Sequence, residues 1–136
     1  MHLDPRLEFD STFVTDLKLC QVHLSHNAAF PWILLIPKQE SVIEIIDLDL
    51  ASRNLLMEEI SLASQVMRCL FQPTKLNVAS LGNIIPQLHI HVIVRYDNDP
   101  AWPNPVWNSG ISTVYDSCKM RERIAQLQEA FSKLAI

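Results

Sequence analysis

The segment QLHIHVIV, residues 87–94, has the alternating pattern of a β-strand and carries two histidines. Successive side chains of a strand point to opposite faces of a sheet. One row is entirely apolar and is expected in a core: Leu88, Ile90, Val92 and Val94. The other row is mostly polar and faces away from that core: Gln87, His89, His91 and Ile93. Neighbours within a row lie about 7 Å apart, so two imidazoles can both reach one tetrahedral group above the sheet.

The spacing of the two histidines leaves three interpretations open. His89 and His91 can be ordinary half-buried residues on an exposed sheet face. They can form half of a metal site, which needs at least one further ligand. The residues that could supply that ligand have no diagnostic spacing: His23, His26, Glu40 and Asp97. They can also act at phosphorus, because neutral imidazole has a reference pKa of about 6.5 and is a nucleophile near pH 7.

The segment SLGN, residues 80–83, precedes the histidine strand and suits an anion-binding turn. A turn that contains glycine can point its backbone amides at an anion, and Ser80 and Asn83 add side-chain donors. The chain has only two glycines, Gly82 and Gly110. We therefore expect each of them where a side chain is not tolerated.

Strands and single long helices alternate along the rest of the chain. Strands are predicted over residues 17–24, 32–36 and 75–80. Asp47 and Asp49 are both candidate N-caps of a helix whose apolar stripe ends before Pro73. A second amphipathic helix is predicted over residues 117–134. This order predicts an α+β domain with an antiparallel sheet.

The loop 95–110 follows the histidine strand and carries two tryptophans. Trp102 and Trp107 can form a wall for a base or a cap near a dimer seam, but packing against the sheet is favoured because large aromatics bury area first. Arg95 can reach a phosphate, although a solvated strand end is the favoured interpretation.

The composition fits one domain spanning residues 1–136. The chain has 49% hydrophobic residues and a formal net charge of −4. This charge argues against a nucleic-acid partner, because proteins that bind nucleic acid usually carry a stripe of basic residues. A small phosphorylated molecule needs only local donors. The longest apolar run, residues 32–36, is too short to cross a bilayer, and the N-terminus has no signal-peptide pattern. The three cysteines predict free, mostly buried thiols in the cytoplasm.

The residue pattern resembles that of the histidine triad (HIT) family, whose motif is His-φ-His-φ-His-φ-φ with φ apolar. The segment QLHIHVI, residues 87–93, matches it except for glutamine at the first position. The resemblance extends over about residues 17–110. It includes WILLIPK at 32–38, LNVASLGN at 76–83 and DPAWPNPVW at 99–107. Together these segments resemble a bacterial branch of the family that carries glutamine at the first motif position.

The resemblance implies a HIT-like antiparallel five-stranded sheet with two main helices, and a homodimer with a ten-stranded sheet. It implies hydrolysis or transfer of a nucleoside monophosphate group from a dinucleoside polyphosphate or a nucleoside phosphoramidate. His89 would attack the α-phosphorus and form a covalent nucleotidyl-histidine, and His91 would contact the phosphate and the leaving-group side. Gln87 would replace the first histidine, and Asn83 would border the phosphate pocket. No cofactor or metal is required, and Mg²⁺ can accompany a polyphosphate as its counter-ion.

The expected site therefore has two parts. The catalytic residues are Gln87, His89 and His91. The residues expected to bind the nucleotide phosphate are Ser80, Gly82, Asn83, Gln87 and His91.

Two departures from the family pattern motivate an alternative function. Gln87 can hydrogen-bond but carries no titrating proton. Many members have a histidine shortly after the Pro-Lys strand end, where this chain has Glu40. The alternative is a nucleotide-binding dimer without catalytic activity.

Overall fold

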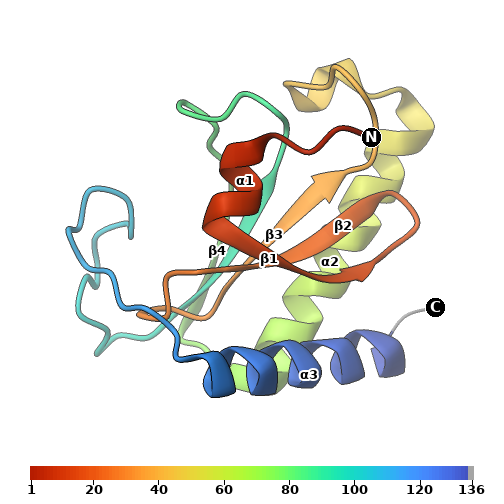
Figure 1. Cartoon of the computed structure of the whole chain (residues 1–136). Coiled ribbons are helices and arrows are strands. Elements are labelled where there is room, and N and C mark those ends of the chain that lie inside the picture. Colours follow the sequence, from red (N-terminus) through yellow and green to blue (C-terminus); the bar gives the residue numbers. More distant parts are fainter. Residues whose placement is uncertain (135–136) are drawn as a thin grey trace.

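The computed structural model of the protein describes residues 1–134 (Figure 1). The strands are β1 (Ser11–Asp16), β2 (Cys20–Ser25), β3 (Trp32–Pro37), β4 (Lys75–Ser80) and β5 (Ile90–Arg95). The helices are α1 (Pro5–Asp10), α2 (Leu50–Phe71) and α3 (Ser117–Leu134), with a 3₁₀ turn at Ile45–Asp47. The single domain predicted for residues 1–136 includes residues 135 and 136, which lie outside the described residues.

The five strands form one antiparallel sheet in the order β1-β2-β3-β5-β4. This confirms the predicted α+β fold with a five-stranded sheet. His91 lies in β5 between two neighbouring strands, opposite Leu34 of β3 and Ala79 of β4. The backbone on both sides of His91 is therefore fixed by hydrogen bonds, which gives its side chain a defined direction.

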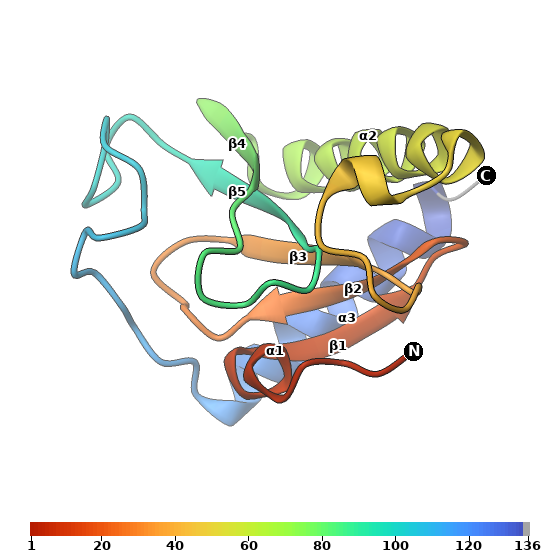
Figure 2. The same ribbon diagram turned by 90° about the horizontal axis from the view of Figure 1, so that it is seen from above.

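The two long helices belong to the same core on one face of the sheet. α2 packs on β5, and α3 packs on both α2 and β1. The predicted apolar row of the histidine segment lies in this core: Leu88, Ile90, Val92 and Val94. Figure 2 shows α1 on the opposite side of the sheet from α2. On that side Leu7 of α1 packs against Leu34 and Ile36 of β3.

The ends of α2 follow from local chemistry. Asp49 is its N-cap, and its carboxylate accepts a hydrogen bond of 2.8 Å from the backbone N–H of Ser52. Asp47, the other predicted cap, instead accepts from the backbone amide of Glu44 within the 3₁₀ turn. The helix ends at Phe71, where Gln72 adopts a left-handed conformation ahead of Pro73.

The histidine strand starts later than the sequence predicts. β5 begins at Ile90 and extends to Arg95, so residues 87–89 precede the ladder. The reason is a competing partner, because the backbone N–H of Leu88 donates to the carbonyl of Val42 in the segment that follows β3. The predicted strand over residues 17–24 likewise begins only at Cys20, after a turn in which the N–H of Leu17 donates to the carbonyl of Cys20.

The sequence interpretation missed α1 and β1. β1 is an edge strand with a bulge between Phe13 and Thr15, and its polar residues interrupt simple alternation. α1 has six residues and begins at Pro5, after the N-cap Asp4, whose carboxylate accepts from the N–H of Arg6. Within residues 1–134, no helix has the length and apolar character needed to cross a membrane.

Candidate functional site

His89 presents one ring nitrogen that the protein leaves without a hydrogen-bond partner. Its Nδ1 lies 2.7 Å from the backbone carbonyl oxygen of Gln87. A carbonyl only accepts hydrogen bonds, so Nδ1 carries a proton and, in the neutral ring, Nε2 has the lone pair. No group among residues 1–134 hydrogen-bonds to Nε2, and this atom is not fully enclosed, because every buried side-chain nitrogen and oxygen of these residues has a partner. The ring is 5% exposed, and it therefore offers a fixed lone pair at the edge of a cavity.

His91 has both ring nitrogens engaged. The indole Nε1–H of Trp32 donates to Nδ1 over 3.0 Å, and Nε2 lies 3.1 Å from the carbonyl oxygen of Leu81. These partners require Nε2 to carry the proton and Nδ1 to be unprotonated. Burial, opposed by the hydrogen bond to the Leu81 carbonyl and assisted by the nearby His89, lowers the pKa of His91 to about 4. Near pH 7 His91 is therefore a neutral imidazole.

The turn after β4 packs against His89, and its close packing leaves no room for a side chain at Gly82. A Cβ added to Gly82 would lie 2.6 Å from the carbonyl oxygen of Ile85 and 3.4 Å from Cε1 of His89. The expectation that Gly82 stands where a side chain is not tolerated is confirmed. No described residue accepts a hydrogen bond from the backbone amides of Gly82 or Asn83. Both amides are therefore available to an anion.

Two hollows meet at His89. The smaller has a volume of about 120 Å³, and its walls include every predicted site residue except His91: Ser80, Gly82, Asn83, Gln87 and His89. Its wall also includes Glu44, which the sequence interpretation did not select. The larger hollow, of about 1000 Å³, is bounded by His89, His91, Trp32 and Trp107, together with Leu7 and Phe9 of α1. Its lining within the described chain contains no lysine or arginine.

Gln87 lies beside the site, but its side chain serves the N-terminal segment. Its Oε1 accepts from the backbone N–H of Asp4 over 2.7 Å, and its Nε2 donates to the carbonyl of His2 over 3.2 Å. Arg6 adds a bond to the carbonyl of Ile84 in the neighbouring turn. The amide of Gln87 therefore joins residues 2–4 to the histidine segment and makes no hydrogen bond to either histidine ring.

Aromatic rings enclose His91. Trp107 meets its ring edge to face with centroids 5.0 Å apart, and Trp32 lies at 5.6 Å. The rings of His89 and His91 are 4.8 Å apart. Packing of Trp107 against the sheet is confirmed by its contacts with the cluster around Ile93, and the same ring also lines the large hollow. The role of Trp32 was not predicted, because its segment was interpreted only as a buried strand.

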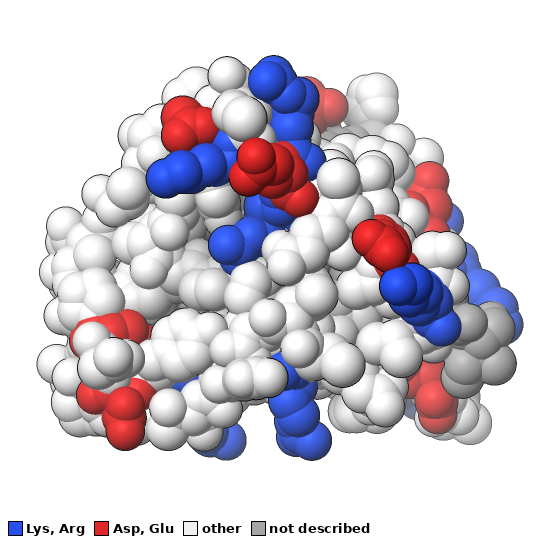
Figure 3. All heavy atoms as spheres, turned by 90° about the horizontal axis from the view of Figure 1, so that it is seen from below, with Lys and Arg blue, Asp and Glu red and all other residues white. Residues whose placement is uncertain are grey.

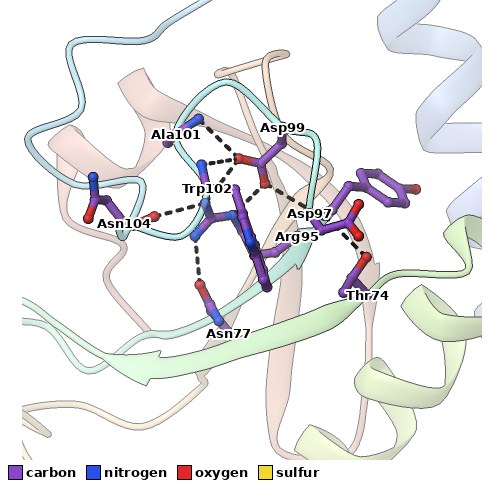
Figure 4. Close-up of polar contacts among 9 residues, drawn as sticks. Thr74, Asn77, Arg95, Asp97, Asp99, Ala101, Trp102 and Asn104 are labelled. Carbon is purple, nitrogen blue, oxygen red and sulfur yellow. Dashed lines mark hydrogen bonds and ion pairs between the residues drawn. The ribbon is translucent and has the colours of Figure 1, made fainter.

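Arg95 is not the solvated strand end that the sequence favoured. It is 1% exposed, and Figure 4 shows its guanidinium between Asp99 and Asn77. Nε and Nη2 bind the Asp99 carboxylate at 2.8 and 3.1 Å, Nη1 binds Oδ1 of Asn77, and Nη2 also donates to the carbonyl of Asn104. The ring of Trp102 covers the group, with its centroid 5.7 Å from Cζ. Arg95 can be buried because the negative charge of the Asp99 carboxylate offsets the lost hydration of the guanidinium.

The histidines His23 and His26 and the three cysteines make no hydrogen bond to His89 or His91 within the described chain. His26 lines the large hollow and shares a hydrogen bond of 2.7 Å with Thr12. His23 is buried between Ser11 and Gln21. Cys20 is buried, but the other two thiols, Cys69 and Cys118, are exposed, so the prediction of mostly buried thiols was wrong.

The described residues show neither a basic patch on the face in Figure 3 nor a cluster of metal-ligand side chains. Figure 3 shows Lys and Arg side chains scattered among Asp and Glu side chains on one face, without a continuous basic patch. No group of three or more His, Cys, Asp or Glu residues within positions 1–134 is arranged to hold a metal ion.

The fold and the sequence are those of a known family. Residues 6–98 match the HIT domain family, and the chain therefore belongs to the histidine triad (HIT) family. The structure is similar to that of a histidine triad protein from Marinobacter aquaeolei VT8, with 39% identity, a TM-score of 0.94 and 98% of each chain covered. A histidine triad protein from Bradyrhizobium japonicum is 38% identical, with a TM-score of 0.92 and coverage of 96% of this chain and 97% of that one.

More distant similarity concerns the fold alone. Diadenosine triphosphate hydrolase from Plasmodium falciparum is 20% identical, with a TM-score of 0.63 and coverage of 98% of this chain and 81% of that one. No curated protein matches the chain. Members of the HIT family are nucleotide-binding hydrolases and transferases.

Proposed function

We propose that this protein hydrolyses or transfers nucleoside monophosphate groups through a covalent nucleotidyl-His89 intermediate. The observation that carries the proposal is the unpartnered Nε2 of His89, held in its nucleophilic tautomer by the carbonyl of Gln87. A neutral imidazole of this kind needs no metal to act as a nucleophile. Mg²⁺ enters only as the counter-ion of a polyphosphate substrate.

In the first step Nε2 of His89 attacks the α-phosphorus. A P–N bond forms as the bond from phosphorus to the leaving group breaks, and the leaving group takes the electron pair and a proton from solvent, to which the attacking water of the second step returns one. Water then attacks the same phosphorus, the P–N electron pair returns to Nε2, and a nucleoside monophosphate is released. An acceptor other than water gives transfer in place of hydrolysis. The substrate class is a dinucleoside polyphosphate or a nucleoside phosphoramidate.

The two hollows give the phosphate and the rest of the substrate places to bind, which supports the proposal. The α-phosphate would lie where they meet, next to the amides of Gly82 and Asn83 and the side chains of Ser80 and Asn83. Donors fixed before reaction stabilise the charge that develops on phosphoryl oxygens, and each is often worth about 3 kcal/mol. With no cationic side chain of the described chain in the large hollow, these amides would carry most of that task.

Labelling tests the covalent step directly. The protein is mixed with adenosine 5′-phosphoramidate or diadenosine tetraphosphate labelled at the α-phosphorus, and denatured at alkaline pH because P–N bonds are labile in acid. We expect label on the wild type and on the control His2→Ala, whose side chain makes no hydrogen bond in the described chain, but not on His89→Ala. The proposal is contradicted if neither substrate labels the wild type, or if His89→Ala becomes labelled.

A nucleotide-binding protein without turnover is the second candidate. It is favoured by the hydrogen bonds that occupy the amide of Gln87 and both ring nitrogens of His91. These leave no evident group beside His89 to protonate a leaving group. Calorimetry that shows nucleotide binding at micromolar concentration, without product in a matched turnover assay, would select this candidate.

The family branch, assembly and location of the protein are further parts of the proposal. Gln87 at the first motif position and the bacterial relatives support the glutamine-bearing bacterial branch. The outer edge of β4, where Val78 is 45% exposed, supports a homodimer with a ten-stranded sheet. Light scattering that gives a mass near 15.5 kDa instead of twice that value would contradict the dimer. The exposed thiols of Cys69 and Cys118 suit the cytoplasm.

A further inference from the structure

Trp32 makes a hydrogen bond that determines the proton position on His91. It is the first residue of β3, pairs with Ile93 of β5 and lies on the same face of the sheet as His91. Its indole Nε1–H donates to Nδ1 of His91 over 3.0 Å. An indole nitrogen can only donate, so this bond exists only while Nδ1 of His91 is unprotonated.

The second bond of His91 follows from the first. With Nδ1 acting as acceptor, the ring proton is on Nε2 and donates to the carbonyl of Leu81 over 3.1 Å. Protonation of the ring would bring two N–H groups to face each other at Nδ1, which is unfavourable for a side chain that is only 6% exposed. A single neutral tautomer satisfies both partners.

The Leu81 carbonyl links His91 to the reactive neighbourhood of His89. Leu81 immediately precedes Gly82, which lies against Cε1 of His89. A ring flip of His91 would break the bond to Leu81 and release the start of this turn. The rings of Trp32 and Trp107 restrict such a flip, because the centroid of each lies within 5.6 Å of the centroid of His91. The two tryptophan rings also pack on each other, with centroids 5.9 Å apart.

We propose that Trp32 is a positioning residue, whose indole N–H holds His91 as the neutral Nε2–H tautomer so that His91 fixes the Leu81–Gly82 turn beside His89. His91 then acts as a support for the phosphate-binding turn and does not deliver a proton. The inference rests on the proposed function in one respect, namely that His89 is the nucleophile which the turn serves.

The charged and titratable groups around His91 are few. His89 faces it from the segment before β5, with ring centroids 4.8 Å apart. β3 contributes Trp32 and Leu34, and the loop before α3 contributes Trp107, none of which titrates near neutral pH. Asp10 and His26 line other parts of the same hollow. The indole N–H at Nδ1 and the Leu81 carbonyl at Nε2 both select the Nε2–H tautomer, and Trp32 is the side chain that acts at Nδ1.

Nuclear magnetic resonance of ¹⁵N-labelled histidines tests the tautomer without any substrate. In the wild type we expect His91 to show an unprotonated Nδ1 and a protonated Nε2 throughout pH 5.5–8. In Trp32→Phe, which keeps an aromatic ring and removes the donor, we expect a mixture of tautomers and a titration midpoint at least one pH unit higher. Trp107→Phe is the matched control and should keep the wild-type pattern.

Kinetics then connect the tautomer to the reaction. For Trp32→Phe we expect kcat to fall about tenfold with KM changed less than threefold, and the acid limb of the kcat profile to move to higher pH. A wild-type His91 that is protonated on Nδ1 overturns the proposal, as does a Trp32→Phe variant that keeps one tautomer and full turnover. If the wild type forms no labelled intermediate, the proposed function fails while the tautomer result still decides whether Trp32 fixes His91.

Discussion

At the N-terminal side of β5, His89 keeps one ring nitrogen without a protein partner, whereas at the C-terminal end Arg95 has every side of its guanidinium occupied. Both side chains are buried and polar. Arg95 is held by a carboxylate, an amide and a backbone carbonyl, so nothing remains for a ligand to bind. His89 is held by one bond that fixes its tautomer and directs the other nitrogen at a cavity. A buried side chain that keeps one polar atom open to a cavity is thus a better guide to reactivity than burial or charge alone.

The largest expected effect separates the chemistry of His89 from its structural role. His89→Gln should lower turnover of adenosine 5′-phosphoramidate by at least about 10³-fold, because the nucleophile is lost. The free energy of unfolding should change by less than about 1 kcal/mol, since the histidine makes only one protein hydrogen bond. Steady-state assays and urea titration measure both quantities. A stability loss as large as the loss of activity would contradict the comparison.

The opposite pattern is expected for Arg95. Arg95→Met should destabilise the protein by about 3–5 kcal/mol, because it leaves the Asp99 carboxylate buried without its partner. Hydrogen bonds from Arg95 first, and then from nearby backbone amides, lower the pKa of Asp99 to about 2 against the opposing effect of burial, so this stabilisation is present above about pH 4 and is lost as the pH falls toward 2. Urea titration at pH 7 measures the effect. The control Lys133→Met removes an exposed ion pair with Glu129 and should cost less than about 1 kcal/mol; equal losses in the two variants would refute the assignment.

Mild acid provides a third test, because burial lowers the pKa values of both His23 and His91 to about 4. The unfolded chain takes up these protons near pH 6.5, before the folded chain does. The free energy of unfolding should therefore be highest above about pH 6.5 and fall as the pH decreases toward 4. His23→Gln should reduce the total fall by about 1–3 kcal/mol. Stability curves of the two proteins that remain parallel between pH 7 and 4 would show that His23 does not contribute.

The smallest effect concerns Gln87. Gln87→Leu removes the two side-chain bonds to residues 2–4 and should cost about 1–2 kcal/mol. It should also raise amide exchange at Asp4 while leaving the labelling of His89 intact. Hydrogen exchange measured residue by residue, together with the labelling assay, separates the two roles. Loss of labelling with unchanged exchange would return Gln87 to the catalytic group.

Much of the fold could be predicted because its signals are local. β4 and α3 have the predicted bounds, and α2 begins after a carboxylate cap and ends before a proline. The alternation of β5 also predicted which side chains enter the core. These elements follow from spacing within one segment. The edge strand β1 escaped prediction, since only one of its residues, Val14, packs in the main helix-side core.

The sequence predicted residues that come together at the small hollow, but not the hydrogen bonds that they make. The small hollow brings Ser80, Gly82, Asn83, Gln87 and His89 together, and their roles in binding and catalysis remain predictions. The partners of Gln87 come from residues more than 80 positions earlier in the chain, and no local pattern reveals such a bond. The burial of Arg95 had one local signal, the acidic residue Asp99 four positions later.

The loop that bears Trp107 is ordered by the protein itself. The Asp99 carboxylate accepts hydrogen bonds from the amides of Ala101 and Trp102 while it holds Arg95. The conformational entropy of this segment is therefore lost when the chain folds and does not have to be lost again when a small molecule arrives. A ligand that reaches the indole of Trp107 meets a preorganised wall, and selection among ligands then depends on steric fit more than on loop closure.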